Sequence, residues 1–298
     1  MLHFVAPAFV LLQLGLQRFT SRLEWLVSLI LATGTVLVLS LIGTWGWFSI
    51  FLVPLYWLLL FVAIWRSVRK YESIILFSPV NPAAWLGFSI SLFLGALAWG
   101  GVLLSFSGQD YPERVVDLAF PFHKKGIYLV GHAGSKPIIN YHNRNASQMY
   151  ALDILKLYPW GGRAKGLYPD MLTEYAIYRT PVFAPCSGKV AAVVNDFPDQ
   201  LPGLFDRDNP AGNYVAIECA GIVVYLAHFS AGTVMVAKGQ RVDRSTRLGL
   251  VGNSGNASEP HLHIHAEEGT YPGVFSGSPG LALTFDQRFL VRNSLVFR

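Results

Sequence analysis

The segment Pro260-His261-Leu262-His263-Ile264-His265 carries three of the eight histidines of this 298-residue chain, at every second position. On an extended strand, alternate side chains point to the same face. The three imidazoles are therefore expected on one face of a sheet, with Leu262 and Ile264 in a core on the other. Several imidazoles on one face are typical of a metal site or a proton relay. The alternative is an exposed strand with incidental histidines.

The N-terminal third of the chain is strongly apolar. Overall the chain is 52% hydrophobic with a mean hydropathy of +0.40. Three runs, 23–45, 46–65 and 83–106, hold at most one charge each and are long enough to cross a hydrocarbon core of roughly 30 Å as helices. Phe4 to Leu16 is too short to span, and is expected to be an interfacial helix or an extension of the first span.

Basic residues predict how these helices are oriented. Arg18 and Arg22 precede the first long span, and Arg66, Arg69 and Lys70 follow the second. Both clusters belong on the cytoplasmic side. No basic stretch precedes the first apolar run and further spans follow, so we expect retained helices rather than a cleaved signal peptide. The sequence thus predicts a multi-pass membrane protein, with a membrane region over 1–106 and an extracytoplasmic domain over 107–298.

The C-terminal part has the pattern of a β domain. Short apolar runs alternate with Gly, Pro, Asn and Asp, as in a sheet or barrel-like fold, and no long helical periodicity occurs. The runs are Gly126–Val130, Gly188–Val194, Asn213–Ile217 and Ile222–Leu226. Part 107–298 is long enough to form one domain with a sizeable core.

The two cysteines, Cys186 and Cys219, both fall in predicted strands of this domain. An exported domain could oxidise them to a disulfide, which needs Cα atoms within about 7 Å. Two buried free thiols are the alternative. The cysteines are not spaced as a zinc pair, so they are left out of the site.

The net charge of +5 does not indicate a nucleic-acid partner. Part of the charge orients the helices, and the rest is scattered without a basic stripe or interleaved aromatic residues. The partner that the composition favours is a lipid bilayer, in which the apolar helices would anchor the chain.

A catalytic zinc site usually takes three protein ligands and leaves one position for water. The histidine strand supplies one or two of them. Asp153 lies in the apolar context Tyr150-Ala151-Leu152-Asp153-Ile154-Leu155, where a buried carboxylate needs a compensating partner, which a metal would provide. The alternative, which would be preferred for this residue taken alone, is an aspartate that holds a backbone turn. His228 follows an apolar strand and, in the company of the other histidines, becomes a candidate acid/base or supporting group.

Several segments in this order resemble the lysostaphin-type zinc metallopeptidases, which cleave peptide bonds in bacterial peptidoglycan. The resemblance covers about half of the chain, from Asp117 to Glu268. Its landmarks are Thr180–Val190, Gly212–Val215 leading to Ala227-His228, Lys238–Val242, Leu248–Gly255 and Pro260–His263. An ordered set of this kind is far more specific than any single motif.

The resemblance implies a fold, a cofactor and a role for each matching residue. The fold is a mainly β metallopeptidase domain with an antiparallel, barrel-sandwich-like sheet. The implied zinc ligands are His142, Asp153 and His263, and the implied catalytic histidines are His228 and His261. His265 lies beyond the motif and receives no role. The implied activity is that of a zinc metalloendopeptidase acting on peptidoglycan peptide.

One departure concerns the spacing of the first two ligands. The family's usual pattern is His, three residues, Asp, whereas ten residues separate His142 from Asp153. Met149 occupies the position four before the aspartate and is a poor ligand for such a site. His142 can serve only if the insert loops out, with Asn140 and His132 as fallback ligands.

Two other functions compete with the peptidase. The first is a catalytically inactive domain of the same fold that binds or activates another cell-wall hydrolase, which the unusual spacing favours and the retained histidines disfavour. The second is a barrel-sandwich carrier or adaptor domain, which resembles the hairpins around Ala184–Val190 and Gly239–Val242 but needs no histidine strand.

Overall fold

The computed structural model describes residues 2–69, 82–273 and 278–298. By its internal contacts the chain divides into two compact units. A helical unit comprises 1–44 and 51–106, and a C-terminal unit comprises 107–298 together with the short segment 45–50. Each unit is described by itself.

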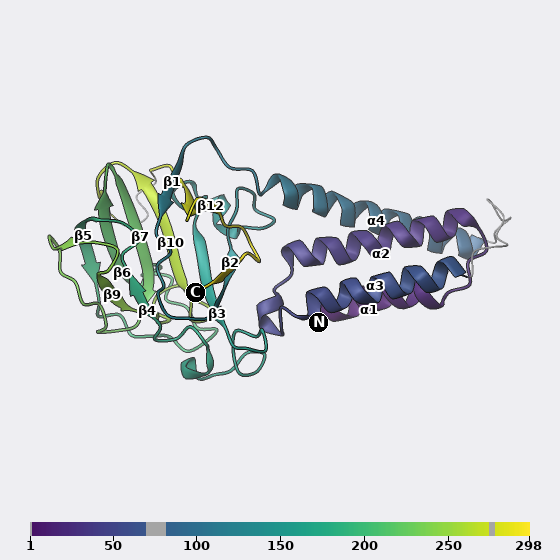
Figure 1. Ribbon diagram of the computed structural model, residues 1–298, viewed down its shortest axis with the longest axis horizontal. Helices are drawn as coiled ribbons and strands as arrows, with labels where there is room; N and C mark the ends of the chain where they lie inside the picture. Colours follow the sequence, from purple (N-terminus) through teal and green to yellow (C-terminus); the bar gives the residue numbers. More distant parts are fainter. Residues whose placement is uncertain (1, 70–81, 274–277) are drawn as a thin grey trace. The chain divides into compact units, whose positions relative to one another are not determined.

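Over its described residues, 2–44, 51–69 and 82–106, the helical unit contains four helices (Figure 1). They are α1 (Leu2–Leu16), α2 (Arg22–Ile42), α3 (Leu52–Arg69) and α4 (Pro82–Ser107). Three stretches, 22–42, 52–69 and 85–107, are long and apolar enough to cross a membrane, while α1 is a shorter apolar helix. The three expected apolar helices are confirmed. Lys70, one of the residues that predicts their orientation, lies outside the described residues.

The second apolar run is not helical over its first residues. Trp45–Trp47 form a 3₁₀ turn, η1, and α3 begins only at Leu52. The backbone of this segment is bonded to the C-terminal unit instead: Gly46 O accepts from Arg163 N at 2.7 Å, and Ile50 N donates to Gly161 O at 3.1 Å. An apolar run alone does not distinguish a helix from a buried turn, because both can have the same composition.

The C-terminal unit is built around an eight-stranded sheet in the order β13-β2-β3-β10-β7-β6-β5-β8 (Figure 1). All its neighbouring strands are antiparallel. The four expected runs lie in β2, β5, β6 and β7. The strands are β2 (Ile127–His132), β3 (Leu152–Leu157), β5 (Gly188–Val194), β6 (Asn213–Cys219), β7 (Ile222–Phe229), β8 (Arg241–Val242), β10 (Leu262–Glu268) and β13 (Leu295–Phe297).

Two smaller sheets complete the unit. One has the order β1-β11-β12, with β1 parallel to β11, and the other pairs β4 with β9. The mainly β, largely antiparallel architecture expected for this part is confirmed. The strands are β1 (Val115–Leu118), β4 (Pro181–Phe183), β9 (Arg247–Leu250), β11 (Ala282–Phe285) and β12 (Arg288–Phe289).

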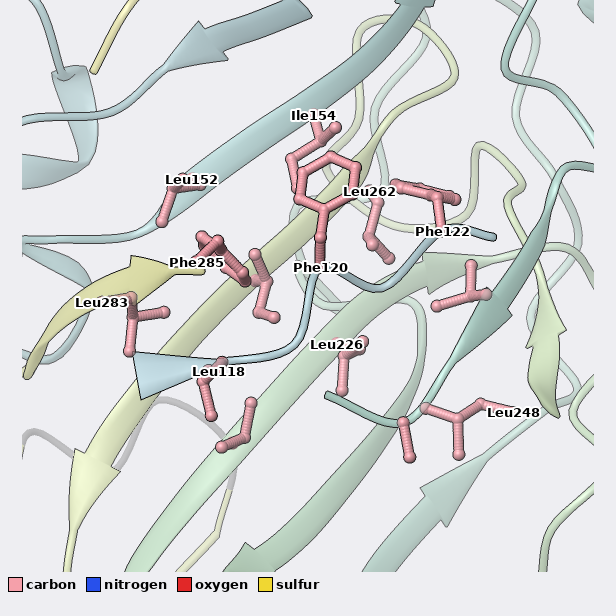
Figure 2. Close-up of a cluster of buried hydrophobic side chains, with 14 of the residues drawn as sticks. Leu118, Phe120, Phe122, Leu152, Ile154, Leu226, Leu248, Leu262, Leu283 and Phe285 are labelled. Carbon is pink, nitrogen blue, oxygen red and sulfur yellow. The ribbon is translucent and has the colours of Figure 1, made fainter. Parts of the chain in front are cut away.

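The main hydrophobic core lies on one face of the large sheet. Leu262 and Ile264 of β10 are fully buried there, beside aliphatic residues of β3 and β7. Figure 2 shows part of this core, in which Phe120, Phe122 and Phe285 gather over the sheet strands. Since strand residues alternate between faces, the histidines of β10 lie on the opposite face. The packing of the core therefore fixes the strand register that places these histidines on the opposite face.

The disulfide that the sequence left open is present between Cys186 and Cys219, with Cα atoms 6.3 Å apart. It joins the turn before β5 to the end of β6, and both cysteines are buried. The bond closes a loop with a sequence separation of 33 residues. A cross-link of this span restricts the unfolded chain and so stabilises the fold.

Replacing both cysteines, as Cys186→Ala with Cys219→Ala, is expected to lower the free energy of unfolding by about 3–4 kcal/mol, the size typical of such a loop. Thermal unfolding of the purified full chain measures this. Dithiothreitol should lower the midpoint of the wild type and leave that of the double variant unchanged. Equal sensitivity of the two proteins would show that the bond contributes nothing.

Candidate metal centre

Asp153 lies at the centre of the site because three strands meet around it. It faces His263 of β10 on one side and His132 of β2 on the other in the strand register. The register of β2 and β3 shifts between Val130 and His132, which marks a bulge beside Asp153. The carboxylate is buried, as its apolar sequence context predicts.

His142 reaches Asp153 from outside the sheet. It lies in the 3₁₀ turn η2 (Tyr141–Arg144), and its Nε2 is 2.8 Å from Oδ2 of Asp153. The fully buried Asn140 holds this turn, because its amide donates to Gly134 O and Ala151 O at 3.0 and 3.1 Å. The ten residues between His142 and Asp153 therefore loop out, with a second turn, η3 (Ala146–Gln148), among them.

A row of alternating polar side chains continues along β10 beyond the ligand position. His263 Nδ1 lies 3.1 Å from Asp153 Oδ1, and its Nε2 lies 3.0 Å from His265 Nδ1. His265 Nε2 in turn lies 3.5 Å from the carboxylate of Glu267. Both His265 and Glu267 are buried, and the His265 ring stacks on Tyr225 with ring centroids 4.6 Å apart. His265, which had no expected role, thus orients the ring of His263.

His228 and His261 form a second pair beside the first group. Their ring centroids lie 4.7 Å apart. Nδ1 of His228 is 2.8 Å from Ser254 O, and Nδ1 of His261 is 2.7 Å from Glu259 O. A carbonyl oxygen only accepts, so Nδ1 carries the proton in both rings and the neutral form leaves Nε2 as an acceptor. His261 Nε2 points toward the centre, 3.6 Å from Asp153 Oδ1.

The backbone at His228 is in an unusual conformation. Its φ angle is +68°, in the left-handed region that non-glycine residues rarely adopt. Gly252 N donates to His228 O at 2.9 Å, and His228 N donates to Ala211 O at 3.2 Å, so both backbone groups are held. Backbone of this kind costs on the order of 1–3 kcal/mol and is concentrated at functional sites.

Burial and mutual charge shift the pKa values of the cluster. Burial lowers the pKa of His263 to about 3, and also lowers the pKa of His228 well below its ordinary value. For Asp153, burial acts to raise the pKa, but the neighbouring His142 and His261, with the hydrogen bond from His142, hold it well below its usual value. At neutral pH the carboxylate is therefore ionised and His263 is neutral, the states that metal binding requires.

The group formed by His142, Asp153 and His263 fits a metal ion. One donor atom from each residue lies within 4.8 Å of the other two, and all three residues are buried. When His263 donates Nε2–H to His265, the lone pair of its Nδ1 faces an ionised oxygen of Asp153 at 3.1 Å. Two facing acceptors repel unless a cation or a proton lies between them. Two histidines and one carboxylate are also a usual ligand set for catalytic zinc.

A cleft of about 360 Å³ gives access to the cluster. Its lining includes His142, His263 and His228, together with the side chains Tyr141, Arg144, Asn145, Gln148, Pro210 and Asn256. Two ligand candidates and one acid/base candidate therefore line the same hollow. A substrate in this cleft would meet both kinds of group.

The fallback ligands lie next to the group but are used differently. The side-chain amide of Asn140 donates to backbone carbonyls, and His132 Nδ1 lies 3.3 Å from Arg292 Nη1. All five residues singled out by the sequence, namely His142, Asp153, His228, His261 and His263, are brought together. Sequence reasoning missed His265 and Glu267, although both continue the two-residue period that begins at His261.

Comparison with known proteins finds similarity to peptidases. Residues 173–272 match the profile of peptidase family M23. His228, His261 and His263 fall inside this match, whereas His142 and Asp153 precede it. A 101-residue stretch is 34% identical to the peptidoglycan DD-endopeptidase ShyA of Vibrio cholerae, covering 33% of this chain and 20% of that protein. The chain thus spans about a fifth of the length of this curated relative.

Solved structures of similar proteins include two peptidases. A zinc-containing peptidase from Vibrio cholerae is 22% identical, with a TM-score of 0.30 and coverage of 52% of this chain and 37% of that one. The catalytic domain of lysostaphin from Staphylococcus simulans is 17% identical, with a TM-score of 0.30 and coverage of 53% and 87%.

The buried histidines predict a pH dependence of stability. Burial lowers the pKa of His132 to about 4 and that of His265 to about 3, both below the ordinary value near 6.5. Because the pKa of these histidines is lower in the folded chain, the unfolded chain binds protons at a higher pH than the folded chain does. Stability is therefore complete above about pH 6.5 and is lost as the pH falls toward 4 and 3, by up to about 1.4 kcal/mol per pH unit for each histidine.

Thermal unfolding of the chelator-treated chain at pH 7 and pH 5 measures this loss. The variant His265→Asn should show a smaller difference between the two pH values than the wild type, whatever its own midpoint. An unchanged difference would show that His265 does not resist protonation in the fold.

Proposed function

The chain carries a domain of peptidase family M23 over residues 173–272, and from this premise we propose that its C-terminal unit is a zinc-dependent endopeptidase acting on peptides of bacterial peptidoglycan. One observation carries the proposal: His142 and Asp153, which lie outside the matched residues, reach His263 inside them to form one buried three-ligand group. The identity of 34% to a peptidoglycan endopeptidase over 101 residues supports the substrate class.

The residues divide between two tasks. His142, Asp153 and His263 would hold the ion, and His265 orients the ring of His263 through the contact between Nε2 and Nδ1. A bound zinc ion supplies Lewis acidity, which lowers the pKa of water toward neutrality and stabilises negative charge on a carbonyl oxygen. The three ligands do not include the groups proposed for proton transfer. Other side chains would therefore act as the acid and the base.

His228 and His261 are suited to that work. Each ring is fixed by an Nδ1–H bond to a backbone carbonyl, and each neutral Nε2 accepts a proton. His261 Nε2 is directed at the ligand group, where it would take a proton from the attacking water or return one to the leaving amine. Holding both rings in advance removes the entropic cost of orienting them during the reaction.

The membrane topology supports an extracytoplasmic site. Segment 45–50 and residues 107–298 belong to one compact unit, so both must lie on the same side of the membrane. Two candidate spans, α3 and α4, separate them along the chain, and two crossings return the chain to the side from which it started. The basic residues around the start of α2 and at the end of α3 favour an extracytoplasmic position for that side, where peptidoglycan is found.

The inactive binding module is disfavoured by the geometry. The long spacing that suggested it is accommodated by the turns η2 and η3, which bring His142 to 2.8 Å from Asp153. A domain without a metal would also leave a buried carboxylate among several imidazoles without a cation. Metal content distinguishes the two functions.

The purified full chain, reconstituted with zinc, is expected to hold about one zinc per chain by atomic absorption. His142→Ala, Asp153→Asn and His263→Ala should each lose it, because three protein ligands are the minimum of such a site. His123→Ala changes an exposed histidine that stacks on Phe183, and serves as the matched control that keeps its metal. Less than a tenth of an equivalent in the wild type would favour the inactive module.

Variants of the acid/base pair should separate metal binding from turnover. His261→Ala and His228→Ala are expected to retain zinc and to lose about 10²- to 10⁴-fold in turnover, the usual contribution of a positioned proton-transfer group. Release of peptides from purified peptidoglycan by the full chain measures the rate. Full activity in both variants would show that these histidines are not catalytic.

A further inference from the structure

The ion pair between Arg163 and Glu259 lies directly behind His261. Arg163 Nε donates to both carboxylate oxygens of Glu259, at 2.8 and 2.7 Å. Arg163 is 1% exposed and Glu259 is 7% exposed. A buried pair of this kind is costly to form and is weak evidence for stability by itself, so its position beside an active histidine invites a functional explanation.

Glu259 is connected to His261 by a short and stiff route. Its carbonyl oxygen accepts the Nδ1–H bond of His261 at 2.7 Å. The intervening Pro260 has a fixed φ angle and restricts the backbone of the residue before it. The carbonyl oxygen of Glu259 and the imidazole of His261 are thus joined by a backbone with few soft torsions, and the ion pair with Arg163 fixes the side chain of the same glutamate. Loss of the ion pair would act on the imidazole through this backbone.

Arg163 is itself held by the segment that joins α2 to α3 along the chain. Arg163 N donates to Gly46 O at 2.7 Å, and its guanidinium carbon lies 4.5 Å from the ring centroid of Trp47. Tyr175 contributes a second aromatic ring, 5.6 Å from the same carbon. An arginine over an aromatic face is attracted by the electrons of the ring.

The same segment packs against the sheet face that carries the cluster. Ile50 packs on Leu129, Leu155 and Leu157, and the last two alternate with Asp153 along β3 and so share its face. Ser49 Oγ donates to Trp160 O at 2.7 Å. By these contacts segment 45–50 is a part of the C-terminal unit, although it is distant from the rest of that unit in sequence.

We propose that Arg163 and Glu259 are positioning residues for His261, and that Trp47 of the segment between α2 and α3, although 39% exposed, holds the guanidinium of Arg163 with its ring. This inference rests on the proposed function for its effect on turnover, but not for its effect on the His261 ring. The catalytic histidine is therefore supported by a residue from between two membrane-spanning candidates. The metal ligands are not in this chain of contacts.

Trp47→Ala in the full chain is the first test. It should lower kcat about 10- to 100-fold, as expected for a displacement of a catalytic group on the order of 1 Å, with KM and zinc content unchanged. Trp47→Phe, which keeps an aromatic face over Arg163, should restore most of the rate. Trp160→Ala is the matched control, since the Trp160 ring is exposed and stacks on Tyr158, while its backbone carbonyl accepts from Ser49 of the same segment.

The ion pair is tested by removing both charges together, as Arg163→Met with Glu259→Gln, which leaves no unpaired buried charge. The control is the exposed pair of Arg114 and Glu268 at the other end of β10, changed to Gln at both positions. The buried double variant should lower kcat about 10- to 100-fold and keep zinc, and the exposed double variant should match the wild type.

A spectroscopic measurement keeps the inference testable if the chain has no peptidase activity. In the full chain labelled with ¹⁵N-histidine and held in lipid nanodiscs, the protonated Nδ1 signal of His261 should be shifted or broadened by Trp47→Ala and by the buried double variant. That of His228 should stay in place. Unchanged kcat together with an unchanged His261 signal would overturn the proposal, as would a loss of zinc that parallels the loss of rate.

Discussion

The buried carboxylate of Asp153 is the constraint on which the site depends. An ionised carboxylate cannot be taken out of water without compensating partners. Here the partners are donor atoms of His142 and His263 at 2.8 and 3.1 Å, with His261 at 3.6 Å. His142 comes from the turn η2, whereas His261 and His263 both lie at the start of β10, so the strand register, the 3₁₀ turn and the end motif must all be correct at once. A metal held by this group would replace the contacts between the side chains by direct ligation.

Period-two alternation made much of this site predictable. The apolar residues Leu262 and Ile264 face the core, and the register that they impose carries His261, His263 and His265 to the other face. The four apolar runs in the C-terminal part likewise became strands. The disulfide could be named only as one of two alternatives, because the distance between two cysteines depends on the packing of β5 against β6 and not on their spacing.

Features that depend on distant residues, or that follow no repeating pattern, could not be predicted from the sequence. The turn that brings His142 inward is held by the amide of Asn140, which looks like any loop asparagine in the sequence. The left-handed backbone of His228 has no residue-type signal, since histidine seldom adopts it. The apolar run that begins at Gly46 indicated a membrane helix from its first residue. Its first residues instead bond to Arg163 and Gly161, partners that no local pattern identifies.

The contact between Ser49 and Trp160 joins residues 111 positions apart in the sequence. During synthesis, segment 45–50 emerges well before the strands that receive it, and α3 and α4 lie between the two. On the proposed membrane topology, the early segment and the late domain can meet only when α3 and α4 have both crossed a bilayer, or neither has. Completion of the β domain would then depend on the insertion of both helices. A chain with one helix misplaced would have a β domain without segment 45–50, which is one of its own parts.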